Sequence, residues 1–262
     1  MNVQADPDEL RPTDDLFTLA LTNPDTDEFD SPRWQAIEAL RRRPTPEVFA
    51  RASALCQSLC VQEQIIGCDV LAQLGAPDMP FATRSFPAVA SVLARSDDLD
   101  AVASAISALG WIGDLRAVDL VLPFVEHSDS DIRFRTAHAL TSLLGDSRSI
   151  DALIRLSADP SVEVRDWSTF GLVTLVEIDT EAIRAALASR LHDSDRETRG
   201  EAILGLAIRK DPRAVDAVVR ELSDDEWIEL LFEAAEQVAD PRCLPGLVRV
   251  QQMIGDVPGL DK

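Results

Sequence analysis

Small and aliphatic residues recur along this chain at the spacing of one helical face. In one segment, Ile132, Thr136, Ala139 and Leu140 stand at positions 0, 4, 7 and 8 of a local frame. Six further segments fit the same frame, with eighth positions at Leu40, Leu74, Leu109, Leu172, Leu206 and Ala235. The seven copies lie 29 to 35 residues apart. Each copy predicts an amphipathic helix, and a constant period over seven copies predicts a repeat protein.

A second helix is predicted after the turn that ends each copy. Val118, Val121, Leu122 and Val125 have the spacing i, i+3, i+4 and i+7, and the region that begins at Val215 repeats it. The turns share the pattern Asp-x-Arg, found at Asp114–Arg116, Asp146–Arg148, Asp211–Arg213 and Asp240–Arg242. The Asp suits the N-terminus of the second helix. Its Arg partner is expected either in the same turn or in a neighbouring repeat.

The segment 109–118, LGWIGDLRAV, resembles the HEAT repeat, in the short bacterial form named after phycobilisome lyases. The resemblance covers about residues 30 to 253. It implies an all-α fold, a right-handed α-solenoid of about seven two-helix HEAT-like repeats. It does not imply an activity, because repeats of this type serve many unrelated roles.

The ends of the chain differ from its middle. Residues 1–30 hold nine acids and one base, and we expect an acidic segment there with a short capping helix over 14–21. Residues 31–254 are predicted to form the solenoid, with an irregular, proline-broken connection over 75–87. Residues 255–262 are predicted to be a short tail.

The net charge of −21 arises at particular places. Residues 1–30 and five junctions between repeats together hold 22 of the 46 acids, and the other 24 are matched by the 24 bases outside residues 1–30. Acids at a helix start are favoured by N-capping and by the helix dipole, at about 0.3–1 kcal/mol each. We favour this structural interpretation. The alternative is an acidic ridge along the stacked junctions that attracts a basic partner.

Several functional classes are disfavoured. The acidic balance argues against nucleic-acid binding, which needs lysine and arginine. Neither a membrane span nor a signal peptide is visible, so we expect a cytoplasmic protein. Cys56, Cys60 and Cys68 lack the spacing of a zinc site and are interpreted as buried small apolar residues. HEAT-type hydroxylases use repeated His-Glu pairs for iron, and only the reversed pair Glu126-His127 occurs. We predict no metal and no cofactor.

HEAT solenoids usually line their concave face with the second helices. Outward positions there are predicted to bind a partner, namely Asp119, Asp151, Arg155, Asp216, Arg220 and Arg249. The alternative without a binding role is a solvated face with the i,i+4 ion pairs Asp151–Arg155 and Asp216–Arg220. Trp111 occupies a turn position that is normally polar in this repeat and is a further binding candidate. The alternative to a binding role is that Trp111 packs against the neighbouring turn.

The function favoured by these features is non-catalytic. We expect a scaffold, adaptor or inhibitor that binds another protein on its concave face and acidic edge, with no nucleic-acid or membrane partner. One sharper version is an immunity-type inhibitor of a basic toxin. The competing class is enzymatic, a phycobilin lyase or chaperone, although no residue identifies pigment chemistry. No catalytic residue is predicted.

Overall fold

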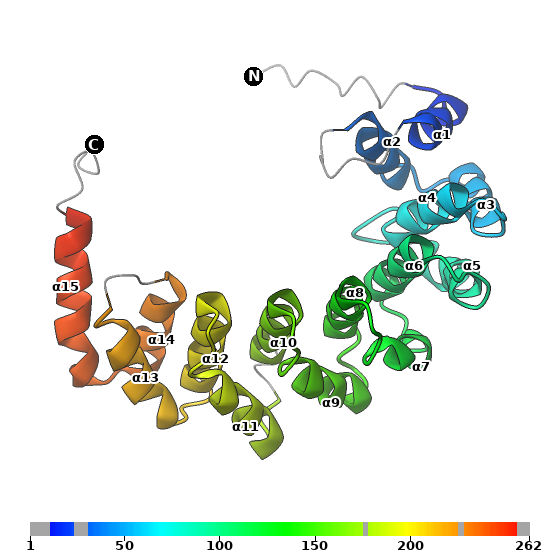
Figure 1. The fold of residues 1–262 in the computed structure, drawn as a ribbon. Coiled ribbons are helices and arrows are strands. Elements are labelled where there is room, and N and C mark those ends of the chain that lie inside the picture. The colour runs from blue at the N-terminus through cyan, green and yellow to red at the C-terminus, as the bar shows by residue number, and fades with distance from the viewer. Residues whose placement is uncertain (1–10, 24–30, 175–177, 225–227, 256–262) are drawn as a thin grey trace. The chain divides into compact units, whose positions relative to one another are not determined.

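A computed structural model describes residues 11–23, 31–174, 178–224 and 228–255, and the regular elements in these ranges are all helices (Figure 1). The α-helices are α1 (Thr13–Thr22), α2 (Pro32–Arg41), α3 (Pro46–Leu55), α4 (Val61–Ala72), α5 (Ala82–Leu93), α6 (Leu99–Ile112), α7 (Ala117–Val121), α8 (Ser130–Thr141), α9 (Ser147–Leu156), α10 (Val162–Thr174), α11 (Glu181–Arg190), α12 (Arg196–Ile208), α13 (Arg213–Glu221), α14 (Leu230–Val238) and α15 (Leu244–Gly255). Two short 3-10 helices are η2 (Leu122–Phe124) and η3 (Pro241–Cys243). The chain forms two compact units, Met1–Ser149 and Ile150–Lys262.

The predicted repeats correspond to successive helix pairs, so the α-solenoid is confirmed. The first helices are α2, α4, α6, α8, α10, α12 and α14, and each is followed by its second helix. Within α8 the frame positions face the core, because Ile132, Thr136, Ala139 and Leu140 each have an exposed fraction of 1% or less. Stability in such a fold comes mainly from burial between neighbouring repeats.

The terminal segments predicted from the sequence, 1–30 and 255–262, lie partly outside the described residues. A helix is present at Thr13–Thr22, where the capping helix is predicted, and it packs against α2. Residues 1–10, 24–30 and 256–262 lie outside the described ranges, as does Trp227, which begins the last repeat copy. The predicted loop over 75–87 is too long, because α5 begins at Ala82 and contains Pro87.

Aspartates begin several first helices in the way the charge analysis expects. The side chain of Asp98 accepts hydrogen bonds from the backbone N–H groups of Asp100 and Ala101. Asp129 and Asp195 cap α8 and α12 in the same way. Such caps satisfy donors that the helix itself leaves without a partner. N-capping therefore explains part of the acidic excess at the junctions.

In two of the Asp-x-Arg turns, the arginine pairs both with the aspartate of its own turn and with an aspartate of a neighbouring repeat. The carboxylate of Asp146 accepts from the backbone N–H of Arg148 at 2.9 Å and from its guanidinium at 2.8 Å. The same guanidinium reaches Asp119 of the preceding repeat at 2.6 Å. In the second unit Arg242 joins Asp216 to the next turn in the same way, at 2.9 Å. These arginines connect successive repeats.

Two layers are visible in the unit that ends at Ser149, with α4, α6 and α8 in one row and α5 and α7 in the other (Figure 1). The first helices approach each other closely because their contacting residues are small. A Cβ atom added to Gly110 of α6 would lie 2.6 Å from the Cα of Ala139 in α8. Because the helices α4, α6 and α8 are closely spaced, their row forms the inner side of the two layers.

The cysteines agree only in part with their predicted role. Cys56 and Cys68 are buried, whereas Cys60 is exposed at the start of α4, so its interpretation as a buried apolar residue is wrong. A hydrogen bond with Cys56, together with burial, raises the pKa of the Cys68 thiol. This thiol is therefore protonated at neutral pH.

No helix in the described part of the chain has both the length and the apolar character that crossing a membrane requires.

Candidate functional site

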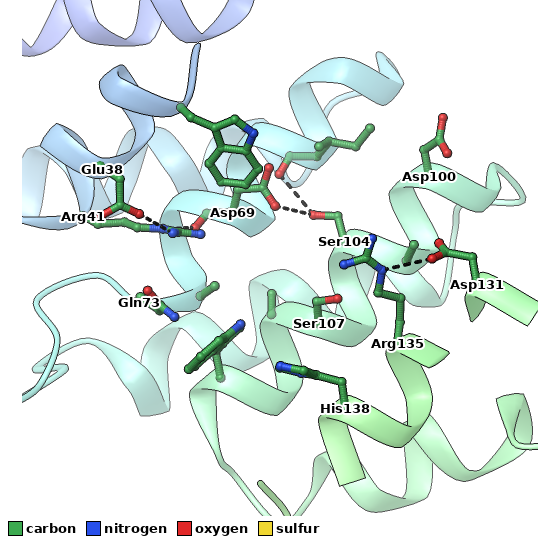
Figure 2. Close-up of a pocket in the computed structure, with 16 residues that line it drawn as sticks. Glu38, Arg41, Asp69, Gln73, Asp100, Ser104, Ser107, Asp131, Arg135 and His138 are labelled. Atoms are coloured by element: carbon green, nitrogen blue, oxygen red, sulfur yellow. Dashed lines mark hydrogen bonds and ion pairs between the residues drawn. The ribbon is translucent and has the colours of Figure 1, made fainter. Parts of the chain in front are cut away.

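The first unit contains a groove of about 810 Å³ along the exposed faces of its first helices (Figure 2). We call it the α2–α8 groove. Its lining residues are Trp34, Glu38 and Arg41 from α2; Ile65, Asp69, Ala72 and Gln73 from α4 and its C-cap; Asp100, Ala103, Ser104, Ser107, Ala108 and Trp111 from α6; and Asp131, Arg135 and His138 from α8. The mixture of aromatic, charged and small residues is typical of a recognition surface.

The groove corrects the expectation that second helices line the hollow face. In this unit the lining comes from α2, α4, α6 and α8, and Asp119 of α7 is not part of it. The reason is the packing described above, because the small residues that let repeats approach lie on the first helices. The side chains that line the hollow therefore project from those same helices.

One end of the groove is rich in carboxylates. Ser104 donates a hydrogen bond of 2.8 Å to the Asp69 carboxylate, which joins α6 to α4 (Figure 2). Asp100 lies exposed one turn before Ser104 on α6. On α8, Asp131 forms an ion pair of 3.4 Å with Arg135. Three neighbouring helices thus each contribute an aspartate to this end.

The other end of the groove is aromatic. Trp111 is 48% exposed, and its ring lies 5.4 Å from the imidazole of His138, tilted by 55°. Burial, and to a lesser extent the charge of Arg135, lower the pKa of His138. The imidazole is therefore neutral at pH 7, and it forms a flat, uncharged wall beside the tryptophan.

The ring of Trp34 is already covered by a cationic side chain of the same protein. The guanidinium of Arg41 lies over its ring, 5.6 Å from the centroid. Arg41 also contacts the Glu38 carboxylate at 2.6 Å and donates to the backbone oxygen of Asp69 at 2.8 Å. This part of the groove is a cation–π arrangement completed within the protein.

The sequence-predicted site residues are divided between the two units. Trp111 lines the α2–α8 groove, and Asp119 pairs with Arg148 outside it. Asp151 and Arg155 are exposed on α9. Both belong to the unit that begins at Ile150, as do the remaining three, namely Asp216 and Arg220 on α13 and Arg249 on α15.

The predicted pairing of Asp216 also needs correction. Its ion pair is with Arg242 of the next turn at 2.9 Å, not with Arg220. Arg220 instead contacts Glu221 at 3.1 Å and the backbone oxygen of Leu191 at 2.8 Å. Arg249 donates to the backbone oxygens of Leu222 and Asp224. These side chains therefore hold neighbouring repeats together.

Sequence reasoning missed most of the groove, although a signal for it exists. The lining residues of α6 are spaced i, i+4, i+7 and i+11, at Asp100, Ser104, Ser107 and Trp111. Asp131, Arg135 and His138 follow the same spacing on α8, and Trp34, Glu38 and Arg41 follow it on α2. A search for a second face on the first helices would have found this stripe.

The second unit has a different electrostatic feature, centred on a half-buried glutamate of α12. Burial raises the pKa of Glu201 to about 7. Asp166 of α10, Glu197 of α12 and Glu233 of α14 add repulsion between like charges. This glutamate is therefore partly protonated at neutral pH.

Among the described residues, no group of three or more histidines, cysteines and acids is arranged to hold a metal ion.

Comparison with known proteins agrees with this architecture. The family of HEAT repeats matches residues 86–173 and 156–239, which is more than half of the chain. This chain belongs to the HEAT-repeat family.

Protein YibA of Escherichia coli (strain K12) is 35% identical to this chain over 118 residues, which are 45% of this chain and 41% of YibA. The alignment thus spans less than half the length of that relative. The X-ray structure of YibA superposes with a TM-score of 0.74 at 23% identity, covering 94% of this chain and 88% of that one. The likeness between the structures supports the fold alone.

The complex of CpcE and CpcF of phycocyanin lyase from Nostoc also resembles this chain. Its TM-score is 0.45 at 16% identity, covering 87% of this chain and 81% of that one. A likeness this low carries no argument for lyase activity.

Proposed function

We propose that this protein is a binding module that takes a segment of a partner protein in the α2–α8 groove. The observation that carries this proposal is Trp111, which is 48% exposed at one end of a groove of about 810 Å³. Large aromatic residues in concave surfaces contribute strongly to protein binding. HEAT repeats generally mediate protein interactions, which supports a scaffold, adaptor or inhibitor.

The charge of the groove favours a basic partner. Its lining includes four acids and two arginines, so it attracts cations and repels acidic segments. An inhibitor that covers a basic surface of its partner is one form of this function. Binding that depends on such charges weakens as salt rises, because the Debye length falls to about 3 Å at 1 M salt.

Crosslinking from inside the groove tests the proposal. A photoreactive phenylalanine analogue replaces Ser107, which lines the groove, or Ala54, which is exposed on α3 outside it. After irradiation in the native cell, adducts are identified by mass spectrometry. We expect one dominant protein adduct from position 107 and none of that protein from position 54.

A second variant separates binding from folding. Trp111→Ala should abolish the adduct from position 107, and because Trp111 is half-exposed it should cost less than about 1.5 kcal/mol of stability. Circular dichroism checks that the helices remain. Equal labelling from both positions, or an adduct that survives Trp111→Ala, would refute the groove as the binding site.

A further inference from the structure

The repeat frame relates a face of the second unit to the groove of the first. In the first unit, positions 3 and 6 of the first helices line the α2–α8 groove, as Ser104 and Ser107 of α6 do. Residues at position 3 of adjacent helices touch, since Ser104 donates a hydrogen bond of 2.8 Å to Asp69 of α4. Because the repeats are equivalent, positions 3 and 6 of α10, α12 and α14 form one continuous face of the second unit.

We call this surface the α10–α14 face. It consists of Trp167 and Phe170 from α10, Glu201 and Leu204 from α12, and Leu230 and Glu233 from α14. The helix α12 packs between the other two (Figure 1). None of the six residues is basic, whereas the groove of the first unit holds two arginines.

The aromatic pair of α10 is the most unusual part of this face. Phe170 is 38% exposed, and its ring lies 5.5 Å from that of Trp167, tilted by 49°. Among the described residues no guanidinium lies over the Phe170 ring, whereas Arg41 covers Trp34 in the groove. An exposed aromatic ring beside carboxylates is a suitable surface for a planar cation, which can stack on the ring and donate hydrogen bonds to the acids.

The carboxyl of Glu201 reports the charges around it. Burial raises its pKa to about 7, and the negative charges of Asp166, Glu197 and Glu233 add to the effect. These acids come from α10, α12 and α14, the three helices that meet at this face. The surroundings of Glu201 therefore favour the arrival of a positive charge.

The helices α11 and α13 also pack against α12, and their arginines are engaged with other acids. Arg190 of α11 pairs with Asp193 at 3.2 Å, and Arg213 of α13 pairs with Asp211 at 2.7 Å. A guanidinium that binds a carboxylate directly lowers the pKa of that acid, as Arg213 does for Asp211. The pKa of Glu201 is raised instead, so these arginines do not neutralise it.

From this arrangement we infer that the α10–α14 face binds an arginine side chain of a partner protein. The guanidinium stacks on Phe170 and donates hydrogen bonds to the carboxylates of Glu201 and Glu197, which lie one turn apart on α12. Charge complementarity identifies this occupant, because an acidic segment would meet like charges on all three helices. The surface is separate from the α2–α8 groove, so this inference does not depend on the proposed function.

Binding of the cation is coupled to loss of the proton from Glu201. With a pKa of about 7, the ionised fraction of Glu201 rises from about one tenth at pH 6 to about nine tenths at pH 8. A ligand that requires the ionised form therefore binds about tenfold more tightly at pH 8 than at pH 6. Ordinary exposed carboxylates are fully ionised throughout this range and give no such dependence.

A pair of short peptides tests the inference with the full-length protein. The probe is acetylated and amidated Ser-Gly-Arg-Gly-Ser, and in the control peptide citrulline replaces arginine, which keeps the shape but removes the charge. Binding is followed at pH 6 and pH 8 by NMR, through the indole N–H signals of the four tryptophans. Trp→Phe variants assign these signals, and Trp167 reports on the α10–α14 face.

We expect the arginine peptide to shift the Trp167 signal more than the Trp111 signal, with a millimolar dissociation constant at pH 8 and about tenfold weaker binding at pH 6. The citrulline peptide should bind at least about fivefold more weakly at pH 8. Equal affinity of the two peptides would overturn the recognition of a cation. A larger shift of Trp111 than of Trp167 would overturn the location.

Single variants connect the pH dependence to Glu201. In Glu201→Gln the arginine peptide should bind with similar affinity at pH 6 and pH 8, because the titrating carboxyl is gone. The matched control Glu181→Gln removes an exposed acid from α11 and should keep the tenfold difference. Circular dichroism checks that both variants keep their helices. A tenfold difference that persists in Glu201→Gln would refute the role of this carboxyl.

A third variant tests the stacking. Phe170→Leu keeps an apolar side chain but removes the ring, so it should weaken the arginine peptide about threefold to fivefold at both pH values and leave the ratio between them unchanged. Unchanged affinity in Phe170→Leu would contradict the stacked arrangement.

Discussion

Replacing Glu201 by glutamine should stabilise the protein at alkaline pH and have little effect at acidic pH. Glu201 lies half-buried on α12, and burial raises its pKa from an ordinary 4.5 to about 7. The repulsion from neighbouring acids acts in the same direction. The folded state therefore binds the proton more tightly than the unfolded chain does between these values.

The sign of the effect follows from proton binding. Because the folded state holds more protons between pH 4.5 and 7, stability decreases as pH rises through this window. The shift of about 2.5 units corresponds to an upper limit of about 3.4 kcal/mol. Glu201 is only half-buried, so solvent screening reduces this limit to about 1.5 kcal/mol. Glutamine cannot ionise and removes this cost.

Urea unfolding followed by circular dichroism measures the difference between Glu201→Gln and the unmodified protein. We expect a gain of about 1.5 kcal/mol at pH 8.5 and less than about 0.5 kcal/mol at pH 5. Comparing the two proteins at each pH cancels the titration of all other groups. The control Glu236→Gln removes an exposed charge from α14 and should change stability by less than about 0.5 kcal/mol at both pH values.

A gain of equal size at pH 5 and pH 8.5 would refute the reasoning, because it would show an effect unrelated to ionisation. So would a loss of stability at pH 8.5. Carbon-13 NMR of the glutamate carboxyl provides a direct check, with an expected titration midpoint near pH 7 for Glu201.

Two further substitutions test what holds the repeats together. Gly110→Ala should cost about 1–3 kcal/mol in thermal or urea unfolding, because its methyl group would lie 2.6 Å from a backbone atom of α8. Gly145→Ala, whose methyl group would meet the side chain of Leu115, should cost less than about 0.5 kcal/mol. Arg165→Ala should cost about 3 kcal/mol, because the guanidinium contacts Asp193 at 2.9 Å and both side chains are largely buried. Arg242 is also paired but exposed, so Arg242→Ala should cost less than about 1 kcal/mol of stability. A similar loss of stability in both arginine variants would contradict the role of burial.

Much of the fold could be predicted from the sequence, because each repeat is encoded locally. The residues at positions 0, 4, 7 and 8 make one apolar helical face, as Ile132 and Leu140 do, and this face is buried in the structure. The N-cap role of Asp129 and the turn role of Asp146 also follow from short-range pattern alone. Local errors arose where proline was taken to end a helix, as at Pro87.

The candidate site was harder to predict, because it depends on which helix face meets its neighbour. Asp119 and Asp216 look like free surface acids in sequence, yet each pairs with an arginine about one repeat away. Conversely, Asp69 and His138 look like unrelated polar residues, and the packing of α4, α6 and α8 places both in one groove.

The repeat, the two-helix unit and the capping chemistry can therefore be read from local sequence, since all three depend on residues within one period of one another. Which row of helices is the inner one depends instead on packing in three dimensions, because small residues such as Gly110 set how closely adjacent repeats approach. Because the first helices form the inner row, Trp111 and the aspartates of these helices line the groove. The acids of the second helices do not line it.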